Sequence, residues 1–509
     1  MKSRAIEFLL AAAVVAALVA CKTPDAARTS PAQEGLEGEA APGDLEGLAD
    51  RLRADLEKSG YEVAKGGTKL FTIDDCKYAV ESVGNCYGNN PVAPYVFATL
   101  PLWPDEFADE AMEGAFGPTE DDTSATFRLD EREAIVVLAQ LPPPGAYFGI
   151  QTYLYGREGA IDESDPLYEK VPAELRHLLF ATTPNPKRAL VFASMGNSNN
   201  AALVERETGS AFGQQRYFVI TPDAAMDRAV REALGRAGVG DPSHVFTEPI
   251  PAELARLGLG PEADDFMTIL RYAEPKDRKA GDAWRKELPL VVLRAREKDR
   301  SRQAEPYPTP AYDERSAQSE LELADELEGL VEAVKQKWAQ PDAAVKEFFS
   351  AYSEIDLVGQ HCVGRPMNCL GDTQDTDTYR ISPTHSIDGG EVIAVVGALA
   401  TATGNATYTN LAVNRFEVLS GVANVSDPDL AGTAASFGVQ NSDKFYVYFF
   451  SRDCTGIENC RELPTDLVPE GETIKIIQRN YIHPGTVRGA DPEQLLEPWS
   501  IVLDGKAPR

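Results

Sequence analysis

The sequence predicts an α+β fold rich in β-strands, with two sandwich-like or mixed domains joined by a helical segment. Short apolar runs bounded by Pro, Gly or Asn recur along most of the 509 residues, which is a strand pattern. Helical periodicity is confined to a few segments, so a doubly wound sheet is not expected. The length also exceeds that of one ordinary core, which favours two or more domains.

Strand patterns dominate residues 67–296, which we expect to form a β-rich domain. One helix interrupts them, because Met226, Val230 and Leu234 recur on one face and Thr221 is placed to cap the start. The expected strands are 135–138, 147–155, 189–193, 216–220, 266–272 and 288–293.

Residues 297–353 read as a linker followed by helices. Three prolines between 306 and 310 stiffen the linker, and Ser319 with Glu322 forms a capping-box pattern. An apolar stripe follows, and residues 342–352 are expected to add a second helix. The stripe consists of Leu323, Leu327, Leu330, Val331, Val334 and Trp338.

Residues 354–509 are expected to form a β-rich C-terminal domain. The segment 444–450 is apolar on both alternating sets of side chains, which predicts a central strand buried on both faces. No internal repeat of 20 to 50 residues is recognisable. The other expected strands are 391–399, 415–419, 473–477 and 500–503.

The N-terminus has the pattern of an export signal. Lys2 and Arg4 form a basic head, residues 8–20 are an apolar run too short to span a bilayer, and Leu18-Val19-Ala20-Cys21 closes it. These residues resemble a bacterial lipoprotein signal peptide with its lipobox; the alternative is an ordinary cleaved signal.

The resemblance implies that residues 1–20 are removed and that Cys21 carries fatty chains such as palmitate. The protein would then be anchored in the membrane of the cell envelope. Lys22, where an Asp would resemble an inner-membrane retention signal, favours the outer membrane. Residues 21–66 are expected to be a flexible tether with a short helix, because apolar residues recur at helical spacing only from 45 to 56.

Six further cysteines form three close pairs in turn-rich sequence. Outside the cytoplasm, an even set at short spacing predicts disulfides, although six cysteines allow fifteen pairings and only local pairing is favoured here. The competing interpretation, a metal site, lacks any CxxC or His pair at ligand spacing. The expected disulfide cysteines are Cys76, Cys86, Cys362, Cys369, Cys454 and Cys460.

The net charge of −31 excludes some partners. A strongly acidic surface repels phosphate backbones, so no nucleic-acid partner is expected. The charge is typical of a soluble, self-repelling surface, with binding of divalent cations or cationic ligands as the sharper alternative.

Motifs for nucleophilic catalysis or phosphate binding are missing from the sequence, since GxSxG, HExxH, GxxxxGK and GxGxxG do not occur. Ser194, Ser198 and Ser210 lie in small-residue turns and are weak nucleophile candidates. The histidines are scattered, and each is expected to be a surface or packing residue. They are His177, His244, His361, His385 and His483.

Acidic clusters are the remaining candidates for chemistry. Asp372, Asp375 and Asp377 alternate in one loop, which suits Ca²⁺, although a solvated turn is the simpler interpretation. Residues 120–122 and the pair Asp427 and Asp429 are weaker versions of the same pattern. No metal or cofactor is predicted from these clusters.

Aromatic and amide residues gather in two stretches, 86–95 and 142–155. Such a mixture suits a sugar- or peptide-binding face and equally suits strand ends and core edges. These stretches vaguely resemble uncharacterised β-rich secreted bacterial proteins, a likeness that implies no activity. The aromatic and amide side chains are Tyr87, Asn89, Asn90, Tyr95, Tyr147, Phe148, Tyr153 and Tyr155.

The sequence therefore predicts a lipid-anchored envelope protein with a binding or structural role and no assigned catalytic residues. A carbohydrate or peptide is the expected kind of ligand. The alternative is an extracytoplasmic hydrolase of polysaccharide or peptide, with or without Ca²⁺. A hydrolase should bring two acids, or a Ser/His pair, into one concave pocket, whereas a binding protein should present aromatic side chains without them.

Overall fold

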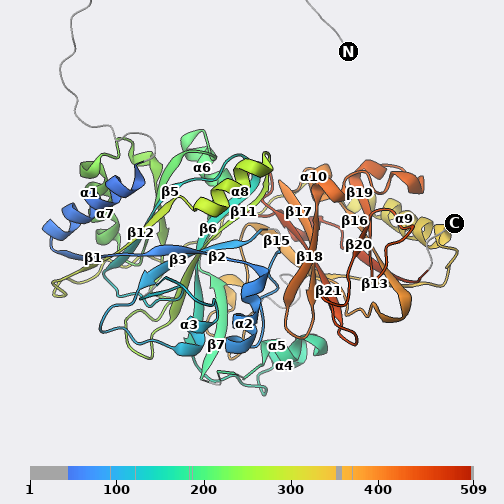
Figure 1. Cartoon of the computed structure of the whole chain (residues 1–509), viewed down its shortest axis with the longest axis horizontal. Helices are drawn as coiled ribbons and strands as arrows, with labels where there is room; N and C mark the ends of the chain where they lie inside the picture. The colour runs from blue at the N-terminus through green and yellow to red at the C-terminus, as the bar shows by residue number, and fades with distance from the viewer. Residues whose placement is uncertain are drawn as a thin grey trace, which may run out of the picture. The chain divides into compact units, whose positions relative to one another are not determined.

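Four β-sheets carry the fold in the computed structural model, two built from residues 61–297 and two from residues 344–504 (Figure 1). The structure describes residues 44–505 except 92, 121, 183, 186, 351–357 and 370. We call residues 44–297 the first half and residues 321–505 the second half. Both halves combine mostly antiparallel sheets with a few helices, which confirms the predicted α+β, β-rich class.

The first half packs two sheets against each other. Ile135 and Val137 of one sheet share a core with Phe148 and Ile150 of the other. The first sheet has the order β1 (Tyr61–Lys65), β12 (Leu290–Glu297), β5 (Glu133–Gln140), β9 (Gln215–Thr221) and β10 (Val245–Pro249). The second has the order β2 (Gly67–Phe71), β3 (Tyr95–Pro101), β11 (Asp265–Pro275), β6 (Gly145–Glu158) and β7 (Arg188–Ser194), with β4 (Thr123–Ser124) on β3 and β8 (Asn199–Asn200) on β6.

The second half is a sandwich of the same kind. Ile393 and Val395 of one sheet pack on Leu411 and Val413 of the other. The third sheet has the order β13 (Ala344–Glu347), β22 (Trp499–Asp504), β16 (Glu391–Ala398), β19 (Phe445–Ser451) and β20 (Cys460–Glu462). The fourth has the order β14 (Phe349–Ser350), β15 (Thr376–Ile381), β21 (Ile474–Tyr481), β17 (Tyr408–Arg415) and β18 (Ser420–Ser426).

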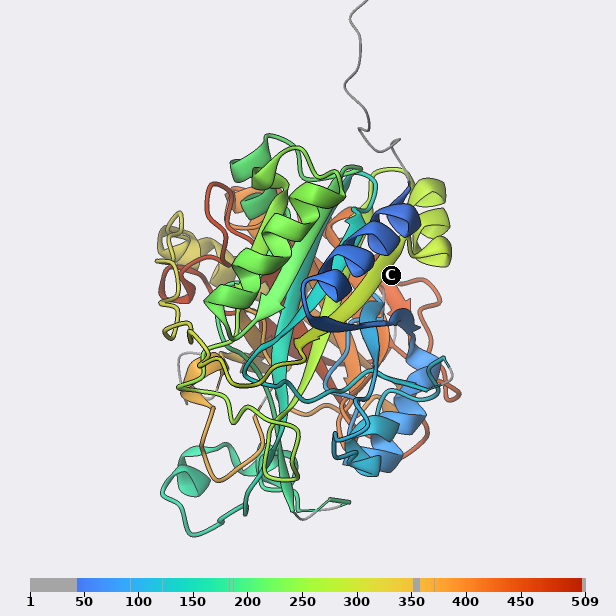
Figure 2. The same ribbon diagram turned by 90° about the vertical axis from the view of Figure 1, so that its left-hand side faces the viewer.

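Helices cover the outer faces of the sandwiches. The side chains of α1 and α7 bury the outer face of the first sheet, and α1 and α7 lie side by side across it (Figure 2). Helix α9 buries the outer face of the third sheet in the same way. The α-helices are α1 (Leu45–Lys58), α2 (Cys76–Val83), α3 (Glu110–Gly114), α4 (Leu167–Lys170), α5 (Arg176–Leu179), α6 (Ala201–Thr208), α7 (Ala224–Ala237), α8 (Arg278–Glu287), α9 (Ala324–Lys337), α10 (Ala400–Thr403) and α11 (Asp427–Leu430). Short 3-10 helices are η1 (Ile73–Asp75), η2 (Ala173–Leu175), η3 (Pro242–His244), η4 (Leu321–Leu323), η5 (Gly359–His361), η6 (Asp388–Gly390), η7 (Ala435–Phe437), η8 (Ser442–Lys444) and η9 (Pro492–Gln494).

Strand for strand, the second half repeats the topology of the first. With β4 and β8 set aside, the first sheet and the third have the same order when strands are matched along the chain, and so do the second and the fourth. The first and third sheets each end in a parallel pair, β9 with β10 and β19 with β20. The other matched pairs of strands are antiparallel. Helix α1 precedes β1 as α9 precedes β13, and a disulfide lies between the second and third strands of both halves.

The register of the sheets repeats as well. Arg271 of β11 lies opposite Tyr95 of β3, and Arg479 of β21 lies opposite Tyr379 of β15. Each guanidinium rests near the ring of its tyrosine, at 5.1 Å and 5.0 Å from the ring centroid. The two halves are therefore two versions of one unit at the level of individual residue pairs.

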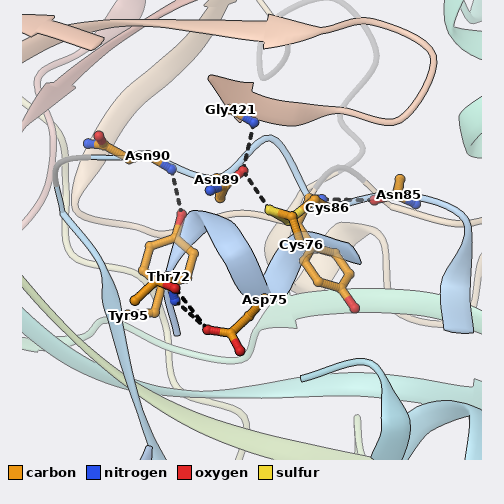
Figure 3. The surroundings of a disulfide bond; sticks show 10 residues. Thr72, Asp75, Cys76, Asn85, Cys86, Asn89, Asn90, Tyr95 and Gly421 are labelled. Carbon is orange, nitrogen blue, oxygen red and sulfur yellow. Dashed lines mark hydrogen bonds between the residues drawn. A yellow bond between two sulfur atoms is a disulfide. The ribbon is translucent and has the colours of Figure 1, made fainter. Parts of the chain in front are cut away.

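The two halves contact each other reciprocally through their disulfide loops. In the first half, the Cys86 N–H donates to the Val418 carbonyl at 2.8 Å, and the Asn89 side chain accepts from Gly421 at 2.8 Å (Figure 3). In return, the Cys369 N–H donates to the Leu190 carbonyl at 3.0 Å. Each loop thus binds the β6–β7 or β17–β18 hairpin of the other half, as in the isologous interface of a symmetric dimer.

Asn89, which bonds the other half just after the first disulfide loop, has a counterpart in Asn368 of the second disulfide loop. The Asn368 side chain accepts from the Leu190 N–H at 2.7 Å and donates to the carbonyls of Leu178 and Ala181. Side chains of both halves share hydrophobic clusters, one of which includes Met367 and Phe416 together with the first-half core. Residues 39–509 accordingly form one compact unit.

Several local predictions differ from the structure. The cap of α7 is Asp223 rather than Thr221, and Ser319 with Glu322 forms no capping box at η4. Residues 342–352 were expected to be helical, but Ala344–Glu347 forms β13, because it finds a partner in β22. Residues 416–419 form the turn of the β17–β18 hairpin rather than a strand. Residues 61–65, placed in the tether, form the edge strand β1, and α1 before it is packed on the sheet.

Candidate functional site

Two pockets lie at places where the two halves differ, although other connections, such as residues 159–187 against 416–419, differ as well. In the first half, residues 222–244 between β9 and β10 contain α7, whereas residues 452–459 between β19 and β20 form a short loop. In the first half, residues 102–132 between β3 and β5 are an insertion, whereas residues 382–390 join β15 to β16 directly. Because the shared parts of both halves serve the common scaffold, these two departures are where a specific function is best sought.

The α9 pocket lies in the second half, next to the short loop that stands in place of α7. Its volume is about 350 Å³. Residues 434–439 cover part of the sheet face here, and the pocket remains beside them. It is lined by Lys337, Trp338, Ser436, Phe437, Phe449 and residues 456–459.

Aromatic rings form the base of the α9 pocket, and polar side chains form its rim. Trp338 ends α9 and packs on Phe449 of β19, with ring centroids 5.5 Å apart. Phe437 is partly exposed, and the Lys337 ammonium lies 4.4 Å from its ring centroid. Lys337 also donates to the Ser436 hydroxyl at 3.1 Å. This combination of apolar base and a few directed polar groups is typical of small-ligand sites.

The loop at one side of the α9 pocket is held in place covalently. Cys454 and Cys460 are joined by a disulfide with their Cα atoms 5.7 Å apart. The Phe449 N–H donates to the Asn459 carbonyl at 2.8 Å, which attaches the same loop to β19. The pocket wall is therefore restrained before any ligand binds.

The acidic pocket is formed by the insertion and α2 in the first half. It has a volume of about 470 Å³ and is lined by Tyr78, Glu110, Glu113, Thr119, Thr123 and Ser124. Burial, and then the negative charge of Glu106, Asp265, Asp109 and Glu110, raises the pKa of Glu113 to about 7. A carboxyl group that titrates near neutral pH thus shares a pocket with a second glutamate, Glu110.

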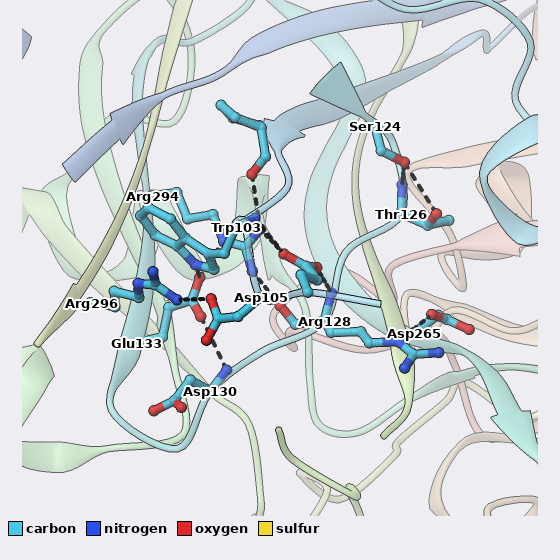
Figure 4. Close-up of polar contacts among 12 residues, drawn as sticks. Trp103, Asp105, Ser124, Thr126, Arg128, Asp130, Glu133, Asp265, Arg294 and Arg296 are labelled. Carbon is cyan, nitrogen blue, oxygen red and sulfur yellow. Dashed lines mark hydrogen bonds and ion pairs between the residues drawn. The ribbon is translucent and has the colours of Figure 1, made fainter. Parts of the chain in front are cut away.

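Buried ion pairs fix the insertion that carries the acidic pocket (Figure 4). Arg294 of β12 is fully buried and pairs with Glu133 and with Glu106, the latter at 2.6 Å. The Trp103 indole N–H donates to Glu133 at 3.0 Å, and the Arg296 guanidinium lies 4.1 Å from the Trp103 ring centroid. Buried ion pairs and a hydrogen bond to Glu133 therefore hold the base of the insertion against β12 and β5.

The aromatic stretches of the sequence form the interior rather than a binding face. Tyr147, Phe148, Tyr153 and Tyr155 are all buried, and the Tyr87 hydroxyl lies 2.6 Å from that of Tyr155. In the same region, Asn89 bonds the other half through Gly421. Asn90 donates to the Tyr408 hydroxyl at 3.2 Å, and its own N–H donates to the Tyr95 hydroxyl.

The acidic loop 372–377 is not the solvated turn that was the simpler expectation, because all three aspartates are buried. Asp372 accepts from Ser194 and the Gly359 N–H, and Asp375 accepts from Tyr147 and Asn200. Asp377 pairs with Arg380 and accepts from Asn480.

The same geometry does not fit the calcium hypothesis, since the carboxylate oxygens face donors on different elements. Within the described residues, no three His, Cys, Asp or Glu side chains are grouped so that they could hold a metal ion. Asp429 caps α11 together with Ser426, and Asp427 accepts from Thr401 and the Thr409 N–H, so this pair is also structural. Asp121 of the 120–122 cluster lies outside the described residues.

The serine candidates have structural partners. Ser194 and Ser198 are buried, and their hydroxyls donate to Asp372 and Asp375, the second at 2.5 Å. Ser210 accepts from Thr208 through its carbonyl at the end of α6. None of these contacts places a histidine beside a serine nucleophile.

The histidines are spread over the fold. Burial lowers the pKa of His385 to about 4 and also lowers the pKa of His483. His177 makes an edge-to-face contact with Phe416, His244 ends η3, and His361 is exposed at the end of η5. No histidine lines the α9 pocket or the acidic pocket.

The structure joins Cys76 to Cys86, Cys362 to Cys369 and Cys454 to Cys460, the local pairs. Cys21 and the signal-like segment lie outside the described residues. From residue 44 onwards, where the chain is described, no helix has the length and hydropathy needed to cross a bilayer.

Comparisons with known proteins identify no family. No protein-family model matches the chain, and no curated protein matches it. Among solved structures, an uncharacterised protein from Burkholderia cenocepacia is similar over 91% of both chains, with 12% sequence identity and a TM-score of 0.38. The likeness is too remote to support an argument about function.

Parts of the α9 pocket are visible in the sequence, but no local pattern joins them. Trp338 ends the predicted helical stripe, and Phe449 lies in the predicted central strand 444–450. Glu110 and Glu113 carried no recognisable signal, because they are two acids among 80 acidic residues in the chain.

Proposed function

We propose that this protein is a lipid-anchored component of the bacterial cell envelope that binds a small ligand in the α9 pocket and does not catalyse a reaction. The observation that carries the binding role is a pocket with an aromatic base beside the short loop that stands where the matching half has α7. The lipobox-like residues before Cys21 support the anchor. The three disulfides support an oxidising compartment.

The anchor is tested by replacing the lipid attachment residue. Cys21→Ser should abolish incorporation of radiolabelled palmitate and release the protein from the membrane fraction, whereas Cys454→Ser should leave labelling intact. Equal labelling of the Cys21→Ser variant and the unchanged protein would refute the anchor.

Ligand binding is tested by screening sugars, amino acids and short peptides for a change in tryptophan fluorescence. The chain has four tryptophans, so a Trp338→Phe variant assigns the signal. We expect hits whose signal disappears in Trp338→Phe and weakens in Phe437→Ala. Hits that are unaffected by both substitutions would place binding elsewhere.

A hydrolase of polysaccharide or peptide is the second candidate, and the acidic pocket is the observation in its favour. Glu113, whose pKa is raised to about 7, lines the same pocket as Glu110, and a carboxyl group with a raised pKa suits general acid catalysis. Turnover of an envelope glycan or peptide that Glu113→Gln abolishes would establish this candidate and remove the non-catalytic role.

A further inference from the structure

Resting on the binding role proposed for the α9 pocket, we infer that its ligand is a neutral saccharide. The formal charges of the lining cancel, because Lys337 and Glu458 are its charged members. The chain as a whole carries a net charge of −31, so this pocket is a locally balanced patch on an acidic protein. A charged sugar of either sign would face one attractive and one repulsive group, so the lining favours neither sign of charge.

The two surfaces of the pocket match the two surfaces of a pyranose ring. The C–H face of a sugar is apolar and suits the partly exposed ring of Phe437, supported beneath by Trp338 and Phe449. The hydroxyl edge requires donors and acceptors, which Lys337, Ser436 and Asn459 supply at the rim. The Lys337 ammonium donates to Ser436 and lies over part of the Phe437 ring, so a sugar would stack on the part of the ring that the ammonium leaves open.

A peptide would need something that this pocket lacks. Extended peptides are commonly bound by adding a strand to an exposed sheet edge. The edge beside the pocket is β20, which spans only Cys460–Glu462 and exposes Arg461 and Glu462. Short, charged edge strands resist strand addition, so recognition through rings and rim groups is favoured over a peptide backbone.

The inference is tested by isothermal titration of the full-length protein with cellotriose, maltotriose and chitotriose, and with trigalacturonate and the tripeptide Gly-Phe-Gly for comparison. At least one neutral trisaccharide should bind. Phe437→Ala should weaken its binding at least tenfold, and Lys337→Met, at an exposed position, should weaken it severalfold without altering the melting curve.

Tyr78→Ala is the matched control, because it removes a partly exposed ring from the acidic pocket. Its affinity should equal that of the unchanged protein, and loss of binding in this variant instead of Phe437→Ala would overturn the inference. If only the tripeptide or trigalacturonate binds, and does so through Phe437, the ligand class is wrong while the binding role stands. If no compound in this titration or in the wider screen depends on Phe437, both proposals fall.

Discussion

Tyr147 and Asp375 meet across the contact between the two halves, with the phenol Oη 2.6 Å from the carboxylate Oδ2. Tyr408 occupies in β17 the register position that Tyr147 occupies in β6: Tyr408 lies opposite Tyr481, and Tyr147 lies opposite Ala273. The Tyr408 hydroxyl accepts a hydrogen bond from the Asn90 side chain of the other half at 3.2 Å. The reciprocal contact is thus made once with a carboxylate and once with an amide. Burial raises the pKa of Asp375, so in this copy of the contact burial opposes ionisation of the carboxyl group.

The first prediction compares the two copies of this contact. Tyr147→Phe removes a donor from a buried carboxylate and should lower the free energy of unfolding by about 2 kcal/mol, whereas Tyr408→Phe should cost about 1 kcal/mol because its partner is neutral. Urea unfolding of both variants measures the difference. Equal losses would show that the Asp375 charge is already satisfied by Ser198 and Asn200.

The second prediction concerns pH. Glu248 is buried, and burial raises its pKa to about 7 although the Thr152 N–H and hydroxyl both donate to it. Between pH 4.5 and pH 7, Glu248 therefore keeps its proton in the folded protein, whereas in the unfolded chain it loses the proton around its ordinary pKa of 4.5. Stability from this group is full below pH 4.5 and declines by about 3 kcal/mol as the pH rises towards 7.

Glu248→Gln keeps a neutral, hydrogen-bonding side chain and should remove this decline. Melting temperatures of both proteins between pH 4 and pH 8 make the comparison. Glu158→Gln on the exposed end of β6 is the control and should leave the slope unchanged. Parallel curves for Glu248→Gln and the unchanged protein would contradict the raised pKa.

The third prediction uses two glycines in opposite surroundings. A Cβ on Gly421 would lie 2.3 Å from the Asn89 backbone oxygen, so Gly421→Ala must push the disulfide loop off the β17–β18 hairpin. We expect a loss of at least about 2 kcal/mol in the free energy of unfolding. Gly235 in α7 has open space around it, and Gly235→Ala should stabilise the protein by up to about 1 kcal/mol.

The fourth prediction separates the two kinds of disulfide. Opening Cys454–Cys460 by double serine substitution frees the wall of the α9 pocket, so ligand affinity should fall together with about 2 kcal/mol of stability. Opening Cys76–Cys86 should lower stability without changing affinity, because that loop serves the contact between the halves. Ligand titration measures the affinity of both variants, and urea unfolding measures their stability. Unchanged affinity in the variant without Cys454–Cys460 would show that this loop does not contribute to binding.

Local patterns predicted the secondary structure well where burial and chain periodicity agree. Residues 444–450 were recognised as a central strand because both faces are apolar, and β19 is buried on both faces between β16 and β20. The prediction of helix at 342–352 was wrong because its pattern is ambiguous and pairing with β22 decides the outcome. The turn at 416–419 was missed because apolar Phe416 and Leu419 pack against the core of the other half.

The sequence by itself determined the mixed β-rich class, most of the central strands and the principal helices, since these depend on side chains within one turn or one strand. Only the tertiary structure decided that the halves repeat one topology, because strand order and register are set by contacts between strands and not by a local sequence pattern. It also decided that the aspartates of 372–377 are buried and that Trp338, Phe437 and Phe449 form one pocket. Those facts depend on contacts such as Trp338 with Phe449 and Asp375 with Tyr147, which join residues far apart in the chain and which a linear pattern does not record.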